Sequence, residues 1–188
     1  RWASRPIGAI TRPASMNGYL AAKGDTQLVA MQLFTPPSSF PLPFTTYHAG
    51  DMQAASAVIG TNASVTFTPM FEGKSDPYAF VQFQTDGTRA GGRTRADDVL
   101  KALTAGTEVS GLKTTRSDSY PWATDARSFR FTSGERKLAG TIIVGERAGR
   151  SYVFFIQHPE ELTEAMAPRV ALILRQWRWE DDYTYLVR

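Results

Sequence analysis

The chain of 188 residues contains no cysteine and only two histidines. The absence of cysteine excludes disulfide bridges, thiolate metal sites and a cysteine nucleophile. No apolar run approaches the roughly 18–20 residues that a membrane-spanning helix needs, so we expect no transmembrane segment in this chain. Because the two histidines have no fixed spacing, we predict no metal site, and no sequence motif indicates a cofactor.

The chain also lacks a long run of basic residues, and its net charge is only +3. A nucleic-acid-binding protein concentrates positive charge on one face or arm and interleaves it with aromatic residues. We therefore expect no nucleic-acid partner. A hydrophobic fraction of 42% and a charged fraction of 21% are typical of a globular protein, and the length fits one domain.

The first 25 residues, "RWASRPIGAITRPASMNGYLAAKGD", are rich in Ser, Ala, Gly and Pro and show little periodicity. They predict an irregular lead-in or tether over residues 1–25, followed by a single domain over 26–188. The chain begins with Arg1 rather than Met, which suggests that a leader or a longer upstream part was removed. We expect an exported protein that is periplasmic, at the cell surface, or membrane-anchored like a lipoprotein through a removed N-terminal segment.

Strand patterns dominate the first half of the domain. Thr26–Phe34 is apolar on both faces, which predicts a strand that is covered on both sides. Ala63–Phe71 and Tyr78–Thr85 alternate apolar and polar residues, and the segment "EGKSDP" between them predicts a hairpin-type connection. Ala54–Ile59 is a short apolar run whose type the sequence leaves undecided.

A first helix is predicted for Arg95–Ala105. Thr94 is expected as its N-cap, and Asp97 and Asp98 lie in the first turn, where the helix dipole favours carboxylates. Gly106 stands just past its end, as is typical of a helix C-terminus.

The C-terminal third contains three strand patterns, at Ser128–Thr132, Lys137–Val144 and Ser151–His158. The connections "SGER" and "GERAGR" are too short for parallel crossovers, so they predict consecutive antiparallel pairing. In the third strand, bulky side chains alternate between both faces, which predicts a central position with a layer on each side.

A second helix is predicted to begin with Pro168 as its first residue. Its buried stripe follows i, i+3, i+4, i+7 spacing and consists of Val170, Ile173, Leu174 and Trp177. Together these patterns predict an α+β fold with a mostly antiparallel β-sheet and helices packed on it.

The order of the C-terminal third is a hairpin, the strand "GRSYVFFIQHP", an acidic turn, and a helix that starts at Pro168-Arg169 and ends in "LRQWRWED". This order resembles the PsbP-like group of α/β/α sandwich proteins, whereas the N-terminal half departs from the family pattern. Members of that group are mostly non-enzymatic extrinsic subunits or accessory proteins that bind a partner, and they are often exported. The resemblance implies a binding or assembly role and carries over no catalytic residue.

The segment "GTRAGGRT" is close to the nucleotide-binding pattern G-x-x-x-x-G-K-[ST], with Arg93 in place of lysine. The planar guanidinium does not replace the compact lysine charge, and the later strands are joined by hairpins, so we predict no nucleotide-hydrolysing site. Two alternatives stay open. Arg89, Arg93, Thr94 and Arg95 bind a phosphate, a sulfate or an acidic partner beside the helix N-terminus, or they form a solvated loop.

The segment "FTTYHAGD" brings Tyr47, His48 and Asp51 close together. A histidine beside a carboxylate suits general-base catalysis or a metal site. A catalytic triad also needs a nucleophilic serine, and Ser38 and Ser39 lie in a proline-rich loop without a nucleophile-elbow context. The alternative interpretation is structural: Tyr47 packs, and His48 is hydrogen-bonded in a loop.

Tyr120 and Trp122 flank a proline in an otherwise polar loop, and they form either a surface that contacts a partner or a local cluster. Trp177 is expected in the core, and a terminal strand or docked tail is expected to bury some of Trp179, Tyr183 and Tyr185.

Basic residues with glutamates beside them mark two hairpin ends and are predicted to form a solvated rim; they are Arg136, Lys137, Arg147 and Arg150.

These observations favour a non-enzymatic, exported or envelope-associated domain that acts through a protein partner. The competing hypothesis is a small-ligand or anion-binding protein, or a hydrolase-type enzyme. It would use Tyr47, His48 and Asp51 together with the loop Arg89–Arg95.

Overall fold

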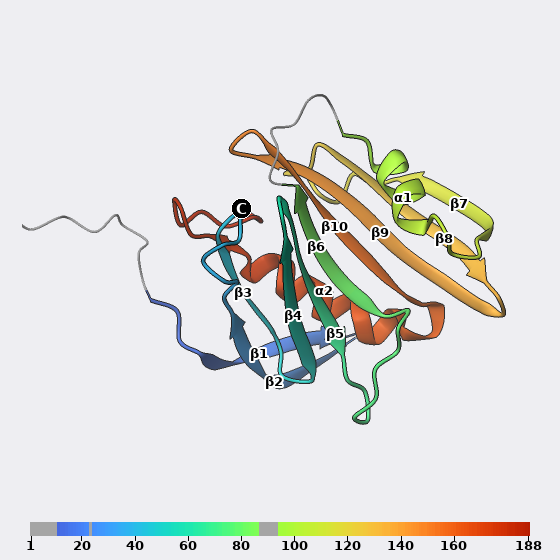
Figure 1. The fold of residues 1–188 in the computed structure, drawn as a ribbon. Coiled ribbons are helices and arrows are strands. Elements are labelled where there is room, and N and C mark those ends of the chain that lie inside the picture. Colours follow the sequence, from blue (N-terminus) through green and yellow to red (C-terminus); the bar gives the residue numbers. More distant parts are fainter. Residues whose placement is uncertain (1–10, 23, 87–93) are drawn as a thin grey trace, which may run out of the picture.

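The computed structural model describes residues 11–22, 24–86 and 94–188. Most of its strands form one seven-stranded antiparallel sheet (Figure 1). In spatial order these strands are β4 (Met52–Ile59), β5 (Asn62–Pro69), β6 (Phe80–Asp86), β10 (Arg150–Pro159), β9 (Arg136–Arg147), β8 (Asp125–Ser133) and β7 (Ser110–Arg116). The hairpin between β5 and β6 and the consecutive antiparallel pairing of β8, β9 and β10 confirm the sequence predictions.

A smaller, four-stranded sheet is built from both ends of the chain. Its strands, in order, are β1 (Ser15–Ala22), β2 (Asp25–Phe34), β3 (Phe44–Ala49) and β11 (Arg178–Trp179). Arg12, ahead of β1, donates hydrogen bonds to the backbone oxygen of Thr45 at 3.1 Å and to Oε1 of Gln176 at 2.9 Å. The beginning of the described chain is therefore fastened to its last third.

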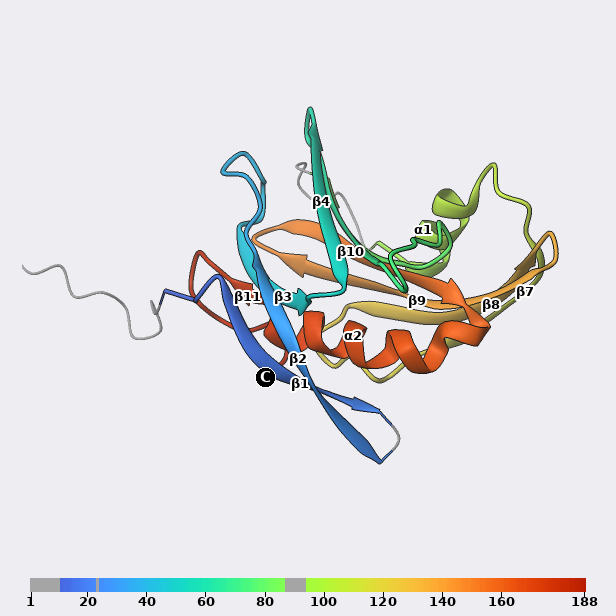
Figure 2. The same ribbon diagram turned by 90° about the horizontal axis from the view of Figure 1, so that it is seen from below.

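The two helices cover opposite faces of the seven-stranded sheet. Helix α1 (Ala96–Thr104) packs on β8 and β9, whereas α2 (Thr163–Gln176) and the small sheet lie on the other face (Figures 1 and 2). Two apolar clusters result, one under α1 around Leu100 and one between the sheet, α2 and β3 around Trp177. The predicted α+β architecture with an antiparallel sheet is confirmed.

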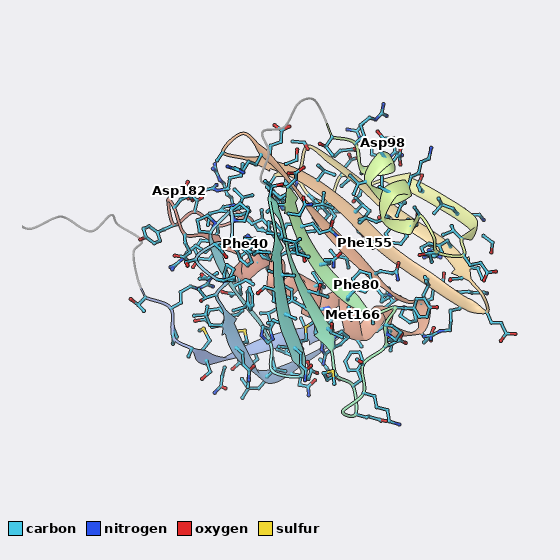
Figure 3. All side chains as sticks on the ribbon, viewed as in Figure 1. Phe40, Phe80, Asp98, Phe155, Met166 and Asp182 are labelled. Carbon is cyan, nitrogen blue, oxygen red and sulfur yellow. The ribbon has the colours of Figure 1, made fainter. Side chains whose placement is uncertain are left out.

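Strand β10 holds the centre of the sheet, as predicted. Its Tyr152, Phe154 and Ile156 belong to the cluster on the α2 side, whereas Val153 and Phe155 pack in the α1 cluster. Figure 3 shows Phe155 near Phe80 of β6, and their rings meet edge to face with centroids 5.0 Å apart. Burial on both faces explains why the strand is apolar without interruption from Tyr152 to Ile156.

The N-terminal part differs from the prediction in two ways. Residues 15–22 of the expected irregular lead-in form β1, which pairs with β2 over its whole length. Strand β2 was expected to be covered on both sides, yet Leu28 is 57% exposed and Met31 is the fully buried residue of the strand. The reason is geometric: the hairpin of β1 and β2 extends beyond the packed layers (Figure 2).

Helix α2 begins five residues earlier than predicted, at Thr163, and contains Pro168 in its interior. A proline at this position provides no N–H donor to the helix, and its ring crowds the carbonyl of Glu164 four residues earlier. A short 3₁₀ turn, Glu160–Leu162, leads into the helix and replaces the expected proline start. Ile173 and Leu174 are buried as predicted, while Val170 is only half-buried.

Helix α1 confirms the acidic first turn and the glycine after its end, but not its predicted cap. Arg95, rather than Thr94, is the N-cap residue, and it forms no capping hydrogen bond through its side chain. The backbone N–H of Ala96 instead donates to Oδ2 of Asp125 at 2.8 Å. A carboxylate from β8 therefore satisfies a helix N-terminus that the local sequence leaves uncapped. Within the described ranges, no helix combines the length and apolar character needed to cross a membrane.

Candidate functional site

Tyr47 and His48 lie in β3, and their side chains point to opposite faces of the small sheet because neighbouring strand residues alternate. The Tyr47 hydroxyl donates to the backbone oxygen of Pro13 at 2.6 Å. The Arg12 guanidinium covers the Tyr47 ring at 4.6 Å from the centroid. Tyr47 thus holds the N-terminal segment, which is a packing role.

His48 is only 5% exposed, and its Nδ1 lies 2.9 Å from the backbone oxygen of Ala49. Burial lowers the pKa of His48 below its ordinary value, and this effect exceeds the opposing ones of the Ala49 carbonyl and the Asp51 charge. Asp51 instead accepts two hydrogen bonds from Arg169, at 3.1 Å from Nε and 2.5 Å from Nη2. Asp51 is thus paired with Arg169, and no hydrogen bond joins it to His48 in the described part of the chain. A catalytic or metal-binding use of Tyr47, His48 and Asp51 stays a prediction.

Arg89 and Arg93 lie outside the described residues. Thr94 is placed beside the start of β10, with its Oγ1 3.1 Å from Oγ of Ser151. Arg95 is exposed at the start of α1. Because α1 and β3 lie on opposite faces of the large sheet, Thr94 and Arg95, at the start of α1, are not brought together with His48.

Tyr120 and Trp122 lie in the loop between β7 and β8, and both are half-buried. Their rings meet edge to face with centroids 5.8 Å apart. Trp122 also stacks on Tyr152 at 6.4 Å and 21°, and meets Phe154 edge to face at 5.8 Å. The pair forms a local cluster that packs against the main core.

The same two aromatics line a cavity of about 630 Å³, which we call the aromatic–arginine pocket. The pocket lies between the Tyr120 loop, the end of α2, the β9–β10 hairpin and the C-terminal segment, residues 179–188. Its characteristic side chains are those of Tyr120, Trp122, Tyr152, Trp179, Arg147 and Arg175.

Arg147 forms one wall of this pocket and is held in place. Its Nη2 lies 2.5 Å from Oδ1 of Asp181 and 2.7 Å from Oδ1 of Asp182, and its guanidinium lies 4.7 Å from the Trp179 ring centroid. Burial alone would lower the pKa of Arg147, but the hydrogen bonds to both carboxylates outweigh it and raise that pKa. The prediction that Arg147 belongs to a solvated rim is therefore wrong.

Arg175 is one of two exposed arginines that line the pocket, and Arg188 is the other. Arg175 donates to the backbone oxygen of Ala171 in its own helix at 3.3 Å, and no carboxylate in the described part of the chain pairs with it. Tyr152 lines the floor, and burial raises the pKa of its hydroxyl, so the phenol stays protonated at neutral pH. The pocket thus offers aromatic surface, a neutral hydroxyl and a free positive charge.

The sequence pointed to Tyr120 and Trp122 but missed the rest of the pocket. Arg147, Arg175 and Trp179 come from three other segments that only the fold brings together. One signal was available in the sequence: Asp181 and Asp182 are adjacent carboxylates after the aromatic run, and they indicate that a cationic side chain of the same chain lies nearby.

A scan against protein-family models gave no match to this sequence, and neither did a search of curated proteins. Among solved structures, the chain is similar to the solution structure of cyanobacterial PsbP (CyanoP) from Synechocystis sp. PCC 6803. The TM-score is 0.51 at 10% sequence identity, over 85% of this chain and 98% of that chain. The chain has a PsbP-like fold. The likeness reaches far beyond the C-terminal third in which the sequence resemblance was seen, and at this identity it concerns the fold alone.

Proposed function

We propose that this PsbP-like chain is a non-enzymatic accessory domain that acts through a protein partner, and that the aromatic–arginine pocket receives that partner. The observation that carries the proposal is the composition of the pocket. Aromatic residues and arginine are enriched at the energetic centres of protein interfaces, and here they converge from four segments.

The charges of the pocket favour a particular kind of contact. Arg147 is neutralised by Asp181 and Asp182, whereas Arg175 keeps its charge available. Glu146 is the only acidic side chain among the residues that line the pocket. A partner segment with an apolar or aromatic anchor followed by a carboxylate would match Trp122 and Arg175.

Site-specific photo-crosslinking in cells that naturally produce the protein tests this proposal. A photoreactive phenylalanine analogue replaces Val187, which is at the pocket rim, or, as the control, Ile59, which is exposed on β4 at the far edge of the large sheet. We expect one discrete adduct from position 187 that is absent from position 59 and is lost in a Trp122→Ala/Arg175→Gln background. Equal adducts at both positions, or an adduct unaffected by the pocket substitutions, would overturn the proposal.

We also propose that the protein is exported or associated with the cell envelope, as the PsbP-like resemblance implies. Fractionation of the native cells with an antibody against this chain tests the location. Recovery of the protein with cytoplasmic markers would contradict it. A function of Arg89, Arg93, Thr94 and Arg95 in binding an anion stays a prediction, which sulfate titration of an Arg95→Gln variant can test.

A further inference from the structure

A second cavity, which we call the α2 groove, lies between α2 and the neighbouring face of strands β7 to β10. Its volume is about 550 Å³, within the range of roughly 300–1,000 Å³ typical of small-molecule sites. It adjoins the aromatic–arginine pocket and shares Tyr120, Ala171 and Leu174 with it. Figure 3 shows Met166, which lines the groove, well separated from Asp182 beside the pocket.

The floor of the groove is two rows of side chains that run across the strands. Each of the four strands contributes two residues that are two positions apart and so face the same way. The register places one row in direct cross-strand pairing as Lys113, Arg130, Ala139 and His158. The next row is Thr115, Ser128, Thr141 and Ile156. A row that contains two cations and a histidine therefore lies beside a row of three hydroxyl groups.

The positive charge of the first row is poorly compensated. Lys113 and Arg130 are direct cross-strand neighbours, and like charges in this arrangement destabilise a sheet. The nearest carboxylate oxygen to Arg130 belongs to Glu160 at 3.9 Å, and the Arg130 side chain is 75% exposed, so this pair contributes little. No aspartate or glutamate is among the residues that line the groove. An anion placed over this row would relieve the repulsion.

The wall of the groove has the opposite character. Met166, Val170 and Leu174 recur every four residues along α2 and present an apolar stripe. Ala167 and Ala171 lie between them, and their small side chains leave the space open. An apolar wall along the length of a helix suits a linear apolar group rather than a compact polar one.

We propose that the α2 groove binds an anionic amphiphile, whose carboxylate or phosphate lies over Lys113 and Arg130 and whose linear apolar chain packs on α2. The hydroxyl row, with Thr115 and Ser128, supplies further hydrogen-bond donors to the head group. This site is independent of the protein partner proposed above, since that contact is assigned to the neighbouring pocket.

Isothermal titration of the intact chain with dodecanoate and dodecyl phosphate, each below its micelle concentration, tests the proposal. Dodecyl maltoside replaces the anionic head by a neutral one, and butyrate removes most of the chain. We expect binding of one or both anionic probes, at least about fivefold weaker binding of the maltoside, and none of butyrate. The preferred anionic probe identifies a carboxylate or a phosphate as the natural head group. Equal affinity for the maltoside, or no binding of either anion, would overturn the proposal.

Matched variants locate the site. Lys113→Gln/Arg130→Gln should weaken binding of the preferred anion at least about fivefold, whereas Lys74→Gln/Lys101→Gln, which removes the same charge from exposed positions elsewhere, should leave it unchanged. Ala167→Phe should fill the groove and abolish binding, and because Ala167 is exposed this variant should still fold. Equal loss in both charge variants, or full binding by Ala167→Phe, would contradict the assignment.

Discussion

Trp122 stacks on Tyr152 across the floor of the aromatic–arginine pocket, with ring planes at 21° and centroids 6.4 Å apart. This contact couples the loop between the edge strand β7 and its neighbour β8 to the central strand β10. The loop therefore owes its conformation to a side chain that the core holds in place.

Replacing Trp122 by alanine should destabilise the fold without unfolding it. The ring is half-buried and contacts Tyr120, Tyr152 and Phe154, so we expect a loss of about 2 kcal/mol in the free energy of unfolding. Urea denaturation at neutral pH measures it. Leu112→Ala, at an exposed position of β7, is the control and should change stability by no more than about 0.5 kcal/mol. Equal losses in the two variants would show that the loop is not anchored as described.

Gly145→Ala tests how closely the Tyr152 ring packs against the backbone of the neighbouring strand. Gly145 pairs directly with Tyr152, and a Cβ atom at position 145 would collide with the tyrosine ring. We expect a destabilisation of about 1–3 kcal/mol. Since the collision needs the ring, the double variant Gly145→Ala/Tyr152→Leu should lose less stability than the sum of the two single variants. Strict additivity in chemical denaturation would contradict this contact.

The pair of Asp51 and Arg169 should contribute to stability through its two-pronged geometry. The Arg169 side chain is only 13% exposed and also lies over the Phe71 ring at 4.9 Å. We expect Asp51→Asn to lower the free energy of unfolding, measured by urea denaturation, by about 1 kcal/mol. The loss should be smaller in high salt, which screens the ion pair.

The comparison for that experiment is Asp118→Asn. Asp118 lies 3.4 Å from Arg116, but both side chains are more than three-quarters exposed. This substitution should therefore have almost no effect on the urea midpoint. An equal loss of stability in Asp51→Asn and Asp118→Asn would mean that partial burial of the Asp51–Arg169 pair does not strengthen it.

The docking of the C-terminal segment should weaken in acid. Hydrogen bonds from Thr184, and then from Arg147, lower the pKa of Asp182 from 3.8 to about 2. A carboxylate whose pKa is lowered by folding stabilises the folded state above its unfolded pKa, and this stabilisation disappears as the pH falls from about 4 to about 2. A change in the tryptophan fluorescence of the chain should report it, because Arg147 lies over the Trp179 ring.

Asp182→Asn is the matched control for the acid titration. It should already show at pH 5 the fluorescence change that the wild-type chain shows only below pH 4. Acid titration curves of identical shape for the wild type and Asp182→Asn would argue against the Asp182–Arg147 pair.

Local pattern was sufficient for much of the fold. The two-faced alternation in β10 predicted its central place, and the spacing of Ile173, Leu174 and Trp177 predicted the buried side of α2. These features succeed because burial imposes a period of two on a strand and of 3.6 on a helix. The sequence did not predict strand β1. Most of this strand is exposed, so its sequence shows no alternation of apolar and polar residues.

The candidate sites depended on contacts that no local pattern encodes. Arg147 and Asp181 are 34 residues apart, and Asp125 caps a helix that begins 29 residues before it. Likewise, the charge row of the α2 groove exists only because the register places Lys113 opposite Arg130. The sequence could name Tyr120 and Trp122, but not what surrounds them.

The small sheet has a consequence for how the protein is made. Its strand β3 pairs with β11, and the Thr45 hydroxyl donates to Glu180, 135 residues later. Arg12 reaches Gln176 across 164 residues. During synthesis this sheet cannot close until residues 176–180 have left the ribosome, although the hairpins of the large sheet can pair earlier. Strands β1, β2 and β3 can pair with one another early, but the other edge of β3 stays unpaired until β11 is made.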